Sequence, residues 1–277
     1  MPGAYPKQGY LLEDFHIFSL KDQSQKFYPY HYHDFYKLLI FHKGNVSYHV
    51  EGKEYALRPG DVILLNPGEI HRAIIHDDSV YSRLIIYLSA GFFRSYQDES
   101  DSSIRSCYRT AELKHSHLIR FSGESAVLMN RLAKELEATI QENGFAASLM
   151  QRIKILEYLI HLNRWMLRDE KSFVPANTAN PTVLGIMEYI NQHLTEDLSS
   201  ETIASALFLN PSYMMHLFKA ETGYTIGRYM TEKRLFLTHQ YMDAGDAVTD
   251  ACMKSGFQSY HAFYHAYRKK YGKAPTK

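Results

Sequence analysis

Three histidines and one lysine in the N-terminal part of the chain have side chains that could bind a small molecule or a metal ion. His31, His33 and Lys37 lie in the stretch HYHDFYK, and His71 lies near the end of the stretch RPGDVILLNPGEIHR. Alternate residues of a β-strand point to the same side, so His31, His33 and Lys37 should share one face. Imidazole nitrogens bind transition metals or take part in hydrogen bonds, whereas an ammonium group attracts anionic or polar molecules.

A family resemblance, given below with the residues that carry it, places His71 beside the other three, and the four residues then allow three interpretations. They can line a pocket in which Lys37 pairs with an anionic or polar effector, which is the interpretation we favour. The three histidines can instead hold a metal ion, although the cation of Lys37 would repel it. The histidines can also be ordinary side chains that are hydrogen-bonded within a small β-domain. We therefore expect an effector site at these residues, with no metal and no cofactor.

A second candidate region, residues 199–223, has the pattern of two short helices joined by a tight turn. Its sequence is SSETIASALFLNPSYMMHLFKAETG. Pro211 cannot continue the first helix but suits the first position of the second. In the second helix Met214 and Phe218 share a buried face, which leaves Met215 and His216 facing outward. This layout is typical of a helix-turn-helix unit.

The chain repeats this layout about 49 residues later, at residues 248–272. The segment HLFKAETG of the first unit aligns with HAYRKKYG of the second, so that His216 matches His265. Residues 261–277 contain five Lys or Arg and no acidic residue, although the net charge of the whole chain is only +1. A local basic patch beside a repeated helix-turn-helix favours binding to double-stranded DNA.

Composition and length limit the remaining possibilities. The chain has 277 residues, enough for two domains, and its 22 Tyr and 15 Phe exclude a disordered protein. The two cysteines form no metal or disulfide framework, and neither a secretory signal nor a membrane-spanning run is visible, so we expect a cytoplasmic protein without membrane contact. No catalytic triad, phosphate-binding glycine loop or pair of catalytic carboxylates stands out, and we expect no enzyme.

The hydrophobic pattern divides the chain into four parts: 1–122, 123–168, 169–180 and 181–277. The first part alternates short strands with Gly/Pro turns, which predicts a small β-sandwich or barrel. The second has the period of a helical pair, the third has no period and reads as a linker, and the fourth is helical throughout. One apolar stripe of the helical pair can be either a core face or a dimer interface; it contains Leu149, Ile153, Leu156 and Ile160.

The fourth part resembles the DNA-binding domain of the AraC/XylS family of bacterial transcription regulators. The residues that carry the resemblance are Ile203-Ala204, Asn210-Pro211-Ser212-Tyr213, Leu217-Phe218-Lys219, Thr222-Gly223, Ser255-Gly256-Phe257, Phe263, Tyr267-Arg268-Lys269-Lys270-Tyr271-Gly272 and Pro275. The resemblance implies about seven helices, in which two helix-turn-helix units joined by a long helix enter successive major-groove segments about 34 Å apart.

The resemblance also assigns roles to individual residues. It implies base contacts from Ser212, Met215 and His216 in the first unit and from Tyr260, His261, Tyr264 and His265 in the second. It implies phosphate contacts from Lys219, Arg268 and Lys269.

Two features depart from the family pattern. His216 and His265 stand where arginine is usual, and histidine cannot make the bidentate contact that arginine makes with guanine. Phe208 occupies the turn position that Gly256 holds in the second unit. If that position is left-handed, phenylalanine costs on the order of 1 kcal/mol there.

The N-terminal part is similar to the cupin-like sensor domain of many such regulators, so the expected fold class is α+β multidomain, with a cupin-like β-barrel and two helices before the all-α DNA-binding domain. In metal cupins a glutamate normally stands at the position of Lys37. The resemblance implies a ligand-responsive regulator that binds promoter DNA and senses a small molecule, such as a sugar or another polar metabolite, as a homodimer, with RNA polymerase as a further candidate partner. The alternative is a metal-dependent cupin enzyme with an appended helical domain.

Overall fold

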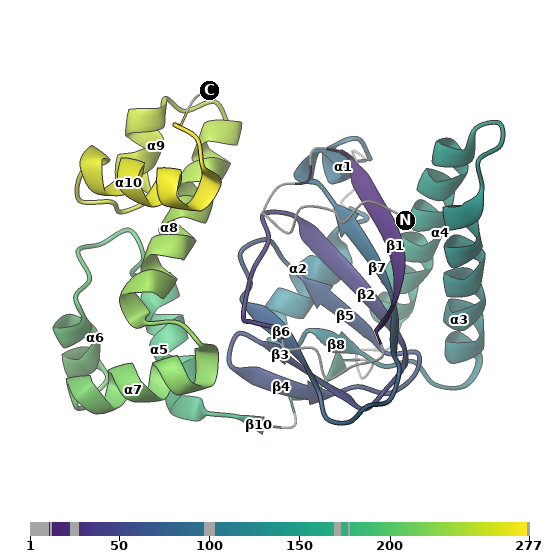
Figure 1. Cartoon of the computed structure of the whole chain (residues 1–277), viewed down its shortest axis with the longest axis horizontal. Coiled ribbons are helices and arrows are strands. Elements are labelled where there is room, and N and C mark those ends of the chain that lie inside the picture. Colours follow the sequence, from purple (N-terminus) through teal and green to yellow (C-terminus); the bar gives the residue numbers. More distant parts are fainter. Residues whose placement is uncertain are drawn as a thin grey trace.

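The computed structural model describes residues 11, 13–22, 28–96, 103–168, 173–176 and 178–275. A β-rich N-terminal domain is followed by a helical C-terminal domain (Figure 1). The α+β fold class is therefore as expected. Among the described residues no helix is long and apolar enough to cross a membrane.

The N-terminal domain consists of two antiparallel sheets. The larger sheet has the strand order β1-β7-β2-β5-β8-β9, and the smaller has the order β10-β4-β3-β6. The strands are β1 (Phe15–Asp22), β2 (Tyr36–Lys43), β3 (Val46–Val50), β4 (Lys53–Ala56), β5 (Val62–Leu65), β6 (His71–Ile75), β7 (Tyr81–Leu88), β8 (Leu118–Ile119), β9 (Phe173–Val174) and β10 (Thr178–Ala179).

Strand β2 shows why both faces of the larger sheet are apolar. Leu39 and Phe41 point into the core between the two sheets, whereas Leu38 and Ile40 point into a second core beneath the helices. Alternate residues of a strand lie on opposite faces, and here each face is covered. This explains why YKLLIFH is a continuous apolar run rather than an alternating one.

The two longest helices of this domain lie on the side away from the C-terminal domain (Figure 1), and all of its helices pack on the outer face of the larger sheet. They are α1 (Ala90–Arg94), α2 (Ser106–Leu113), α3 (Gly123–Ala138), the short 3-10 helix η1 (Thr139–Gln141) and α4 (Ala147–Arg168).

The side chains that helix α4 buries are not those of the stripe for which the sequence allowed a core face. Its buried side chains are Ile155, Tyr158, Leu159, Leu162 and Met166. Leu149, Ile153 and Ile160 are exposed, and Leu156 is half-buried. The core-face interpretation of that stripe is therefore wrong, because α4 is apolar on two sides and the periodicity could not tell which side faces the sheet.

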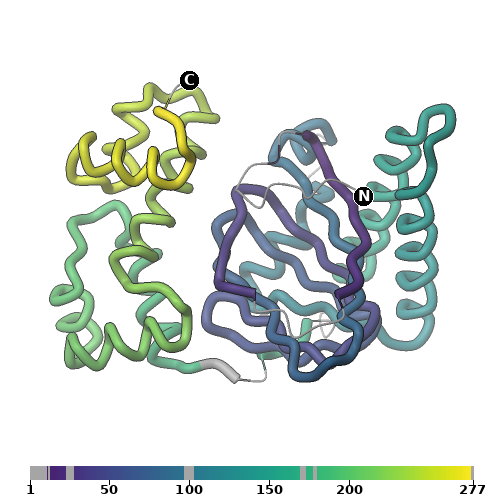
Figure 2. The backbone as a smooth tube through the Cα atoms, in the orientation of Figure 1, coloured from purple at the N-terminus to yellow at the C-terminus, as the bar shows by residue number. Residues whose placement is uncertain are grey.

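The segment predicted as a linker contributes two short strands where it is described. β9 pairs with β8, and β10 pairs with β4, so the chain adds to both sheets before it enters the helical domain. The helical domain that follows is the part coloured from green to yellow in Figure 2. Residues 169–172 and 177 of this segment lie outside the described residues. The domain boundaries stay a prediction.

The described C-terminal domain, from residue 181 to residue 275, contains six helices, close to the expected seven. They are α5 (Pro181–Gln192), α6 (Ser200–Ala206), α7 (Pro211–Thr222), α8 (Ile226–Asp243), α9 (Val248–Lys254) and α10 (Tyr260–Tyr271). One core gathers α5, α6, α7 and the first half of α8, and a second gathers α9, α10 and Leu235 of α8. Helix α8 thus connects two small helical units.

Candidate functional site: two exposed reading helices and a buried histidine cluster

Local capping chemistry fixes both helix-turn-helix units. The side chain of Asn210 accepts a hydrogen bond from Tyr213 N at 3.1 Å, with Pro211 at the first helical position of α7. Ser259 caps α10 in the same way, through Ala262 N at 3.2 Å. Both helices end at a left-handed glycine, Gly223 or Gly272. These caps satisfy the free backbone groups of the helix ends and set where each helix begins and ends.

The outer face of α7 is exposed as expected. Met214 and Phe218 are fully buried, and the four residues assigned to DNA contact are exposed; these are Ser212, Met215, His216 and Lys219. In α10 the buried pair is Phe263 and Tyr267. Tyr260, His261, His265, Arg268 and Lys269 are exposed, and Tyr264 is half-buried. The faces are thus accessible, while DNA contact itself stays a prediction.

Two histidines on α10 interact directly with each other. The Nε2 atoms of His261 and His265 are 3.0 Å apart, and the rings are 4.3 Å apart. At this distance the Nε2–H of one ring donates to the Nε2 lone pair of the other. His265 already lacks the bidentate contact of an arginine, and this pairing further limits its contacts with DNA, because it occupies a ring nitrogen that could hydrogen-bond a base edge.

The four effector-site residues come together in the N-terminal domain, at one end of β2 and β6. Among the described residues, the ligand atoms of His31, His33 and His71 lie within 4.8 Å of one another. Lys37 Nζ is 3.4 Å from His71 Nε2 and donates a hydrogen bond to the Tyr48 hydroxyl at 2.9 Å. We refer to His31, His33, His71 and Lys37 as the histidine cluster.

Backbone carbonyls set the orientation of two of these rings. His31 Nδ1 lies 2.9 Å from the carbonyl of Pro29, and His71 Nδ1 lies 2.9 Å from the carbonyl of Glu69. A carbonyl can only accept, so both Nδ1 atoms donate, and both Nε2 atoms present a lone pair to the cluster. His33 Nε2 is buried and has no hydrogen-bond partner among the described residues.

Burial and the neighbouring cation favour the neutral forms of His33 and His71. Burial is the main cause that lowers the pKa of His33 and of His71 well below the usual value, and the charge of Lys37 adds to it. Neutral rings with inward lone pairs could serve a metal ion. The ammonium group of Lys37 does not fit such an ion, since it already stands beside His71 Nε2, where it is the positive group of the cluster. The histidine cluster therefore suits a polar molecule better than a metal.

Several residues of these sites escaped the sequence analysis. Tyr48 holds Lys37, and Tyr30 and Tyr32 alternate with the cluster histidines and contact the C-terminal domain. The alternation Tyr-His-Tyr-His in the sequence was the available signal, because inward histidines require the tyrosines to face outward.

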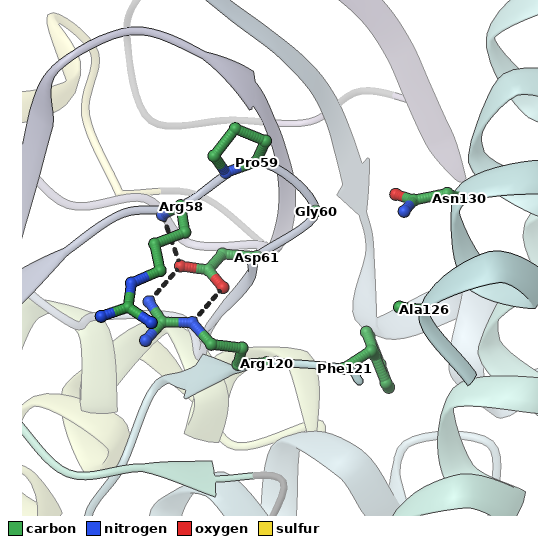
Figure 3. A pocket seen from close by; sticks show the side chains of 8 residues that line it. All are labelled: Arg58, Pro59, Gly60, Asp61, Arg120, Phe121, Ala126 and Asn130. Carbon is green, nitrogen blue, oxygen red and sulfur yellow. Dashed lines mark hydrogen bonds and ion pairs between the residues drawn. The ribbon is translucent and has the colours of Figure 1, made fainter. Parts of the chain in front are cut away.

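A second hollow, of about 210 Å³, lies between the turn before β5 and helix α3 (Figure 3). Its only ion pair among the described residues joins Arg120 to Asp61, at 2.7 Å and 2.6 Å. The hollow is lined by Arg58, Pro59, Gly60, Asp61, Arg120, Phe121, Ala126 and Asn130. Asp61 neutralises Arg120, the other cation of the lining belongs to the exposed Arg58, and no predicted site residue lies in this hollow.

A β-domain with a buried polar cluster, joined to two helix-turn-helix units with exposed faces, defines a class of protein: the ligand-responsive transcription regulators. Residues 16–154, half of the chain, match the model of the AraC-like ligand binding domain, and residues 203–277 match a helix-turn-helix domain. The chain belongs to the AraC/XylS family of transcription regulators and senses a ligand through the first domain and binds DNA through the second.

Curated relatives are similar to most of this chain, and solved structures are similar to the whole or to part of it. The HTH-type transcriptional activator RhaS of Escherichia coli strain SMS-3-5 is 22% identical, over 90% of this chain and 86% of its own length. Among solved structures, ToxT from Vibrio cholerae O395 is 14% identical over 95% of both chains, with a TM-score of 0.39. The DNA-binding domain of AdpA in complex with a target DNA is 20% identical, covers 35% of this chain and 87% of its own, and has a TM-score of 0.33. RhaS is a transcriptional activator, and the cupin-enzyme alternative has no support.

Proposed function

We propose that this regulator binds specific promoter DNA through the outer faces of α7 and α10 and activates transcription in response to a small polar effector. The observation that carries the proposal is that α7 and α10, which we call the reading helices, are capped, have exposed outer faces and lie on either side of α8. Base contacts would come from α7 and α10, and Lys219, Arg268 and Lys269 would position the domain on the phosphates. RNA polymerase is the partner that an activator in the cytoplasm requires.

The effector proposal rests on the hydrogen-bonding character of the histidine cluster. His31 offers an acceptor at Nε2, and Lys37, which lies 3.4 Å from His71 Nε2, offers a donor. A molecule with neighbouring hydroxyl groups can donate to the first and accept from the second. We therefore propose a sugar or a similar polyhydroxylated metabolite rather than a bare anion.

The dimer proposal rests on the exposed stripe of α4. Leu149, Ile153 and Ile160 are 56%, 48% and 38% exposed, and Leu156 lies between them. An apolar stripe at helical spacing on a long helix is suited to pack against a second copy of itself. Helix α4 lies on the side of the N-terminal domain away from the C-terminal domain, so pairing through α4 would leave α7 and α10 free (Figure 1).

Fluorescence anisotropy with promoter fragments and with random DNA, over a series of salt concentrations, tests the proposal. We expect tighter binding to at least one fragment and a steep decline of affinity with salt. Replacing Lys269 with Met should weaken binding to all fragments and reduce the salt slope by about one. Replacing His216 with Arg should change the preference among fragments. Equal affinity for every fragment at every salt concentration would refute specific DNA binding.

A further inference from the structure

Residues 30–33 touch both the histidine cluster and the DNA-binding domain. The segment is extended and is held to the start of β6, because His31 and His71 exchange two backbone hydrogen bonds at 3.0 Å and 2.8 Å. The carbonyl of His33 accepts a third bond, from Gly68 N at 2.7 Å. In an extended segment alternate side chains face opposite sides, and the histidines therefore point to the cluster while the tyrosines point away from it.

Tyr30 contacts the end of the first reading helix. Its hydroxyl donates to the carbonyl of Glu221, in the last turn of α7, at 2.6 Å, and its own carbonyl accepts from the Tyr224 hydroxyl at 3.3 Å. The ring lies so close to Gly223 that an added Cβ there would be 2.4 Å from Tyr30 Cδ2. On its other side the ring carries the guanidinium of Arg72, 4.2 Å from the ring centre.

Tyr32 contacts the end of the second reading helix. Its ring lies under Lys270 Nζ, in the last turn of α10, at 3.7 Å, and its hydroxyl donates to the carboxylate of Glu232 on α8. Lys270 completes the arrangement with an ion pair to Glu232 at 3.1 Å. Lys270 is one residue of the basic C-terminal patch, and here it faces the N-terminal domain rather than the reading face of α10.

The two faces of this segment cannot move independently. A rotation or a one-residue shift of the extended segment would exchange its faces and break the three backbone bonds. A displacement of His31 or His33 by a molecule in the cluster therefore displaces Tyr30 and Tyr32 as well. The hydroxyl of Tyr30 bonds α7, and the ring of Tyr32 lies against Lys270 of α10. Both helices are far from this segment in sequence.

We propose that residues 30–33 couple the histidine cluster to both reading helices: His31 and His33 respond to what occupies the cluster, and Tyr30 and Tyr32 set the positions of the C-terminal ends of α7 and α10. This inference rests on the proposed function, since it assigns the route by which the effector site acts on DNA binding. The coupling changes how the two helix-turn-helix units are presented without any effector contact to them.

Hydrogen exchange on the full-length protein without DNA tests the coupling. The cluster is perturbed by His33→Gln and, independently, by His33→Ala, so that one variant remains if the other fails to fold. We expect exchange at residues 219–224 and 266–272 to become about fivefold faster, which corresponds to the loss of about one hydrogen bond. His42→Ala is the matched control: this histidine of β2 contacts Glu137 of α3, and its loss should leave both helix ends at wild-type rates.

The tyrosines are tested one at a time. Tyr30→Phe removes the hydroxyl that bonds Glu221 and should speed exchange at the end of α7 only. Tyr32→Leu removes the ring that lies against Lys270 and should speed exchange at the end of α10 only. Tyr28→Phe is the control, because that hydroxyl donates to Asp22 within the N-terminal domain. Wild-type exchange at both helix ends in both His33 variants would overturn the coupling, even if the protein binds a specific promoter. Absence of specific DNA binding would refute the proposed function and leave the exchange result standing.

Discussion

At the scale of single residues, Lys37 decides what the histidine cluster can bind. Three imidazoles with ligand atoms within 4.8 Å of one another are a set that could hold a transition metal, but the ammonium group of Lys37 lies 3.4 Å from His71 Nε2. A cation at that place repels a metal ion, whereas a carboxylate would add a fourth, anionic ligand. One substitution should therefore change the class of ligand.

We predict that Lys37→Glu binds one Zn²⁺ per chain and that the wild-type protein does not. Isothermal titration calorimetry with Zn²⁺ measures the difference. Lys37→Met is the control, because it removes the cation without supplying a ligand and should bind Zn²⁺ at least tenfold more weakly than Lys37→Glu, about 1.4 kcal/mol. Stoichiometric Zn²⁺ binding by the wild-type cluster would show that Lys37 leaves room for a metal.

Glu69 and His117 form a buried pair in which both groups favour the neutral form. Burial raises the pKa of Glu69 from 4.5 to about 8 and lowers the pKa of His117 from 6.5 to about 4. The nearest atoms of the pair are 3.4 Å apart. Above pH 4.5 the unfolded chain releases the proton of Glu69 that the folded protein keeps up to about pH 8, so stability falls as pH rises through this window. Below pH 6.5 the unfolded chain protonates His117 and the folded protein does not, so stability also falls toward pH 4.

The stability contributed by this pair should therefore be greatest at about pH 5–6. We predict that Glu69→Gln removes the decline on the alkaline side and gains about 1–2 kcal/mol relative to the wild type between pH 6 and pH 8. Urea unfolding at a series of pH values measures it. Glu112→Gln, at an exposed position, is the control and should keep the wild-type pH profile. If Glu69→Gln keeps that profile as well, Glu69 is not the group that titrates.

At the scale of elements, the turns of the two helix-turn-helix units differ in strain. Phe208 has a φ of 56° and is 97% exposed, and Gly256 has a φ of 89° at the matching position. The left-handed conformation that the sequence suggested for position 208 is thus confirmed. An added Cβ at Gly256 would lie 2.6 Å from the carbonyl oxygen of Leu194, so only the second turn also needs glycine for space.

We predict that Phe208→Gly stabilises the protein by about 0.5–1 kcal/mol, since it relieves the strain and an exposed ring loses no packing. Gly256→Ala should destabilise it by more than about 1 kcal/mol, because conformational strain and a backbone clash add together. Chemical unfolding of the three proteins gives both values. If Phe208→Gly is instead less stable than the wild type, the ring of Phe208 makes a contact whose contribution to stability exceeds the cost of the left-handed backbone.

The exposed stripe of α4 should form the dimer interface. Ile153→Asp should weaken self-association at least tenfold, about 1.4 kcal/mol, because a charge would be buried between two copies. Sedimentation equilibrium measures the association. Leu113→Asp replaces an apolar side chain of α2 that is 69% exposed and lies off the stripe, so it should associate like the wild type. Unchanged association of Ile153→Asp would place the dimer interface elsewhere.

At the scale of the whole molecule, the sequence predicted what local chemistry determines. The caps at Asn210, Ser259, Gly223 and Gly272 lie beside the helices that they end, so both helix-turn-helix units could be located from the chain alone. The shared face of His31, His33 and Lys37 followed from the alternation of side chains along a strand, whereas the addition of His71 followed only from the family resemblance. The burial direction of α4 could not follow, since both of its sides are apolar.

The contacts between the domains could not be predicted either. Glu51, in the turn between β3 and β4, meets Lys233 of α8, which is 182 residues further along the chain. No local pattern marks such a pair, because each side chain alone is an ordinary surface charge. Its partner becomes evident only when the two domains have been placed together.

The Glu51 carboxylate joins the two domains through hydrogen bonds. It accepts hydrogen bonds from the Tyr229 hydroxyl at 2.9 Å, from Lys233 at 3.0 Å and from Ile70 N at 2.7 Å. Tyr229 is fully buried, and the side chain of Lys233 is 15% exposed. Removing the carboxylate leaves a buried hydroxyl and a buried cation without this partner, which should cost about 2–3 kcal/mol at the interface.

We therefore predict that the wild-type protein unfolds in a single calorimetric transition and that Glu51→Ala splits it into two, one for each domain, since each has its own core. Differential scanning calorimetry shows the difference. Glu142→Ala, at an exposed position between α3 and α4, should keep the single transition. A single transition in Glu51→Ala, merely shifted to lower temperature, would mean that the apolar contacts of Ile70 and the neighbouring helices hold the domains together without the charge network.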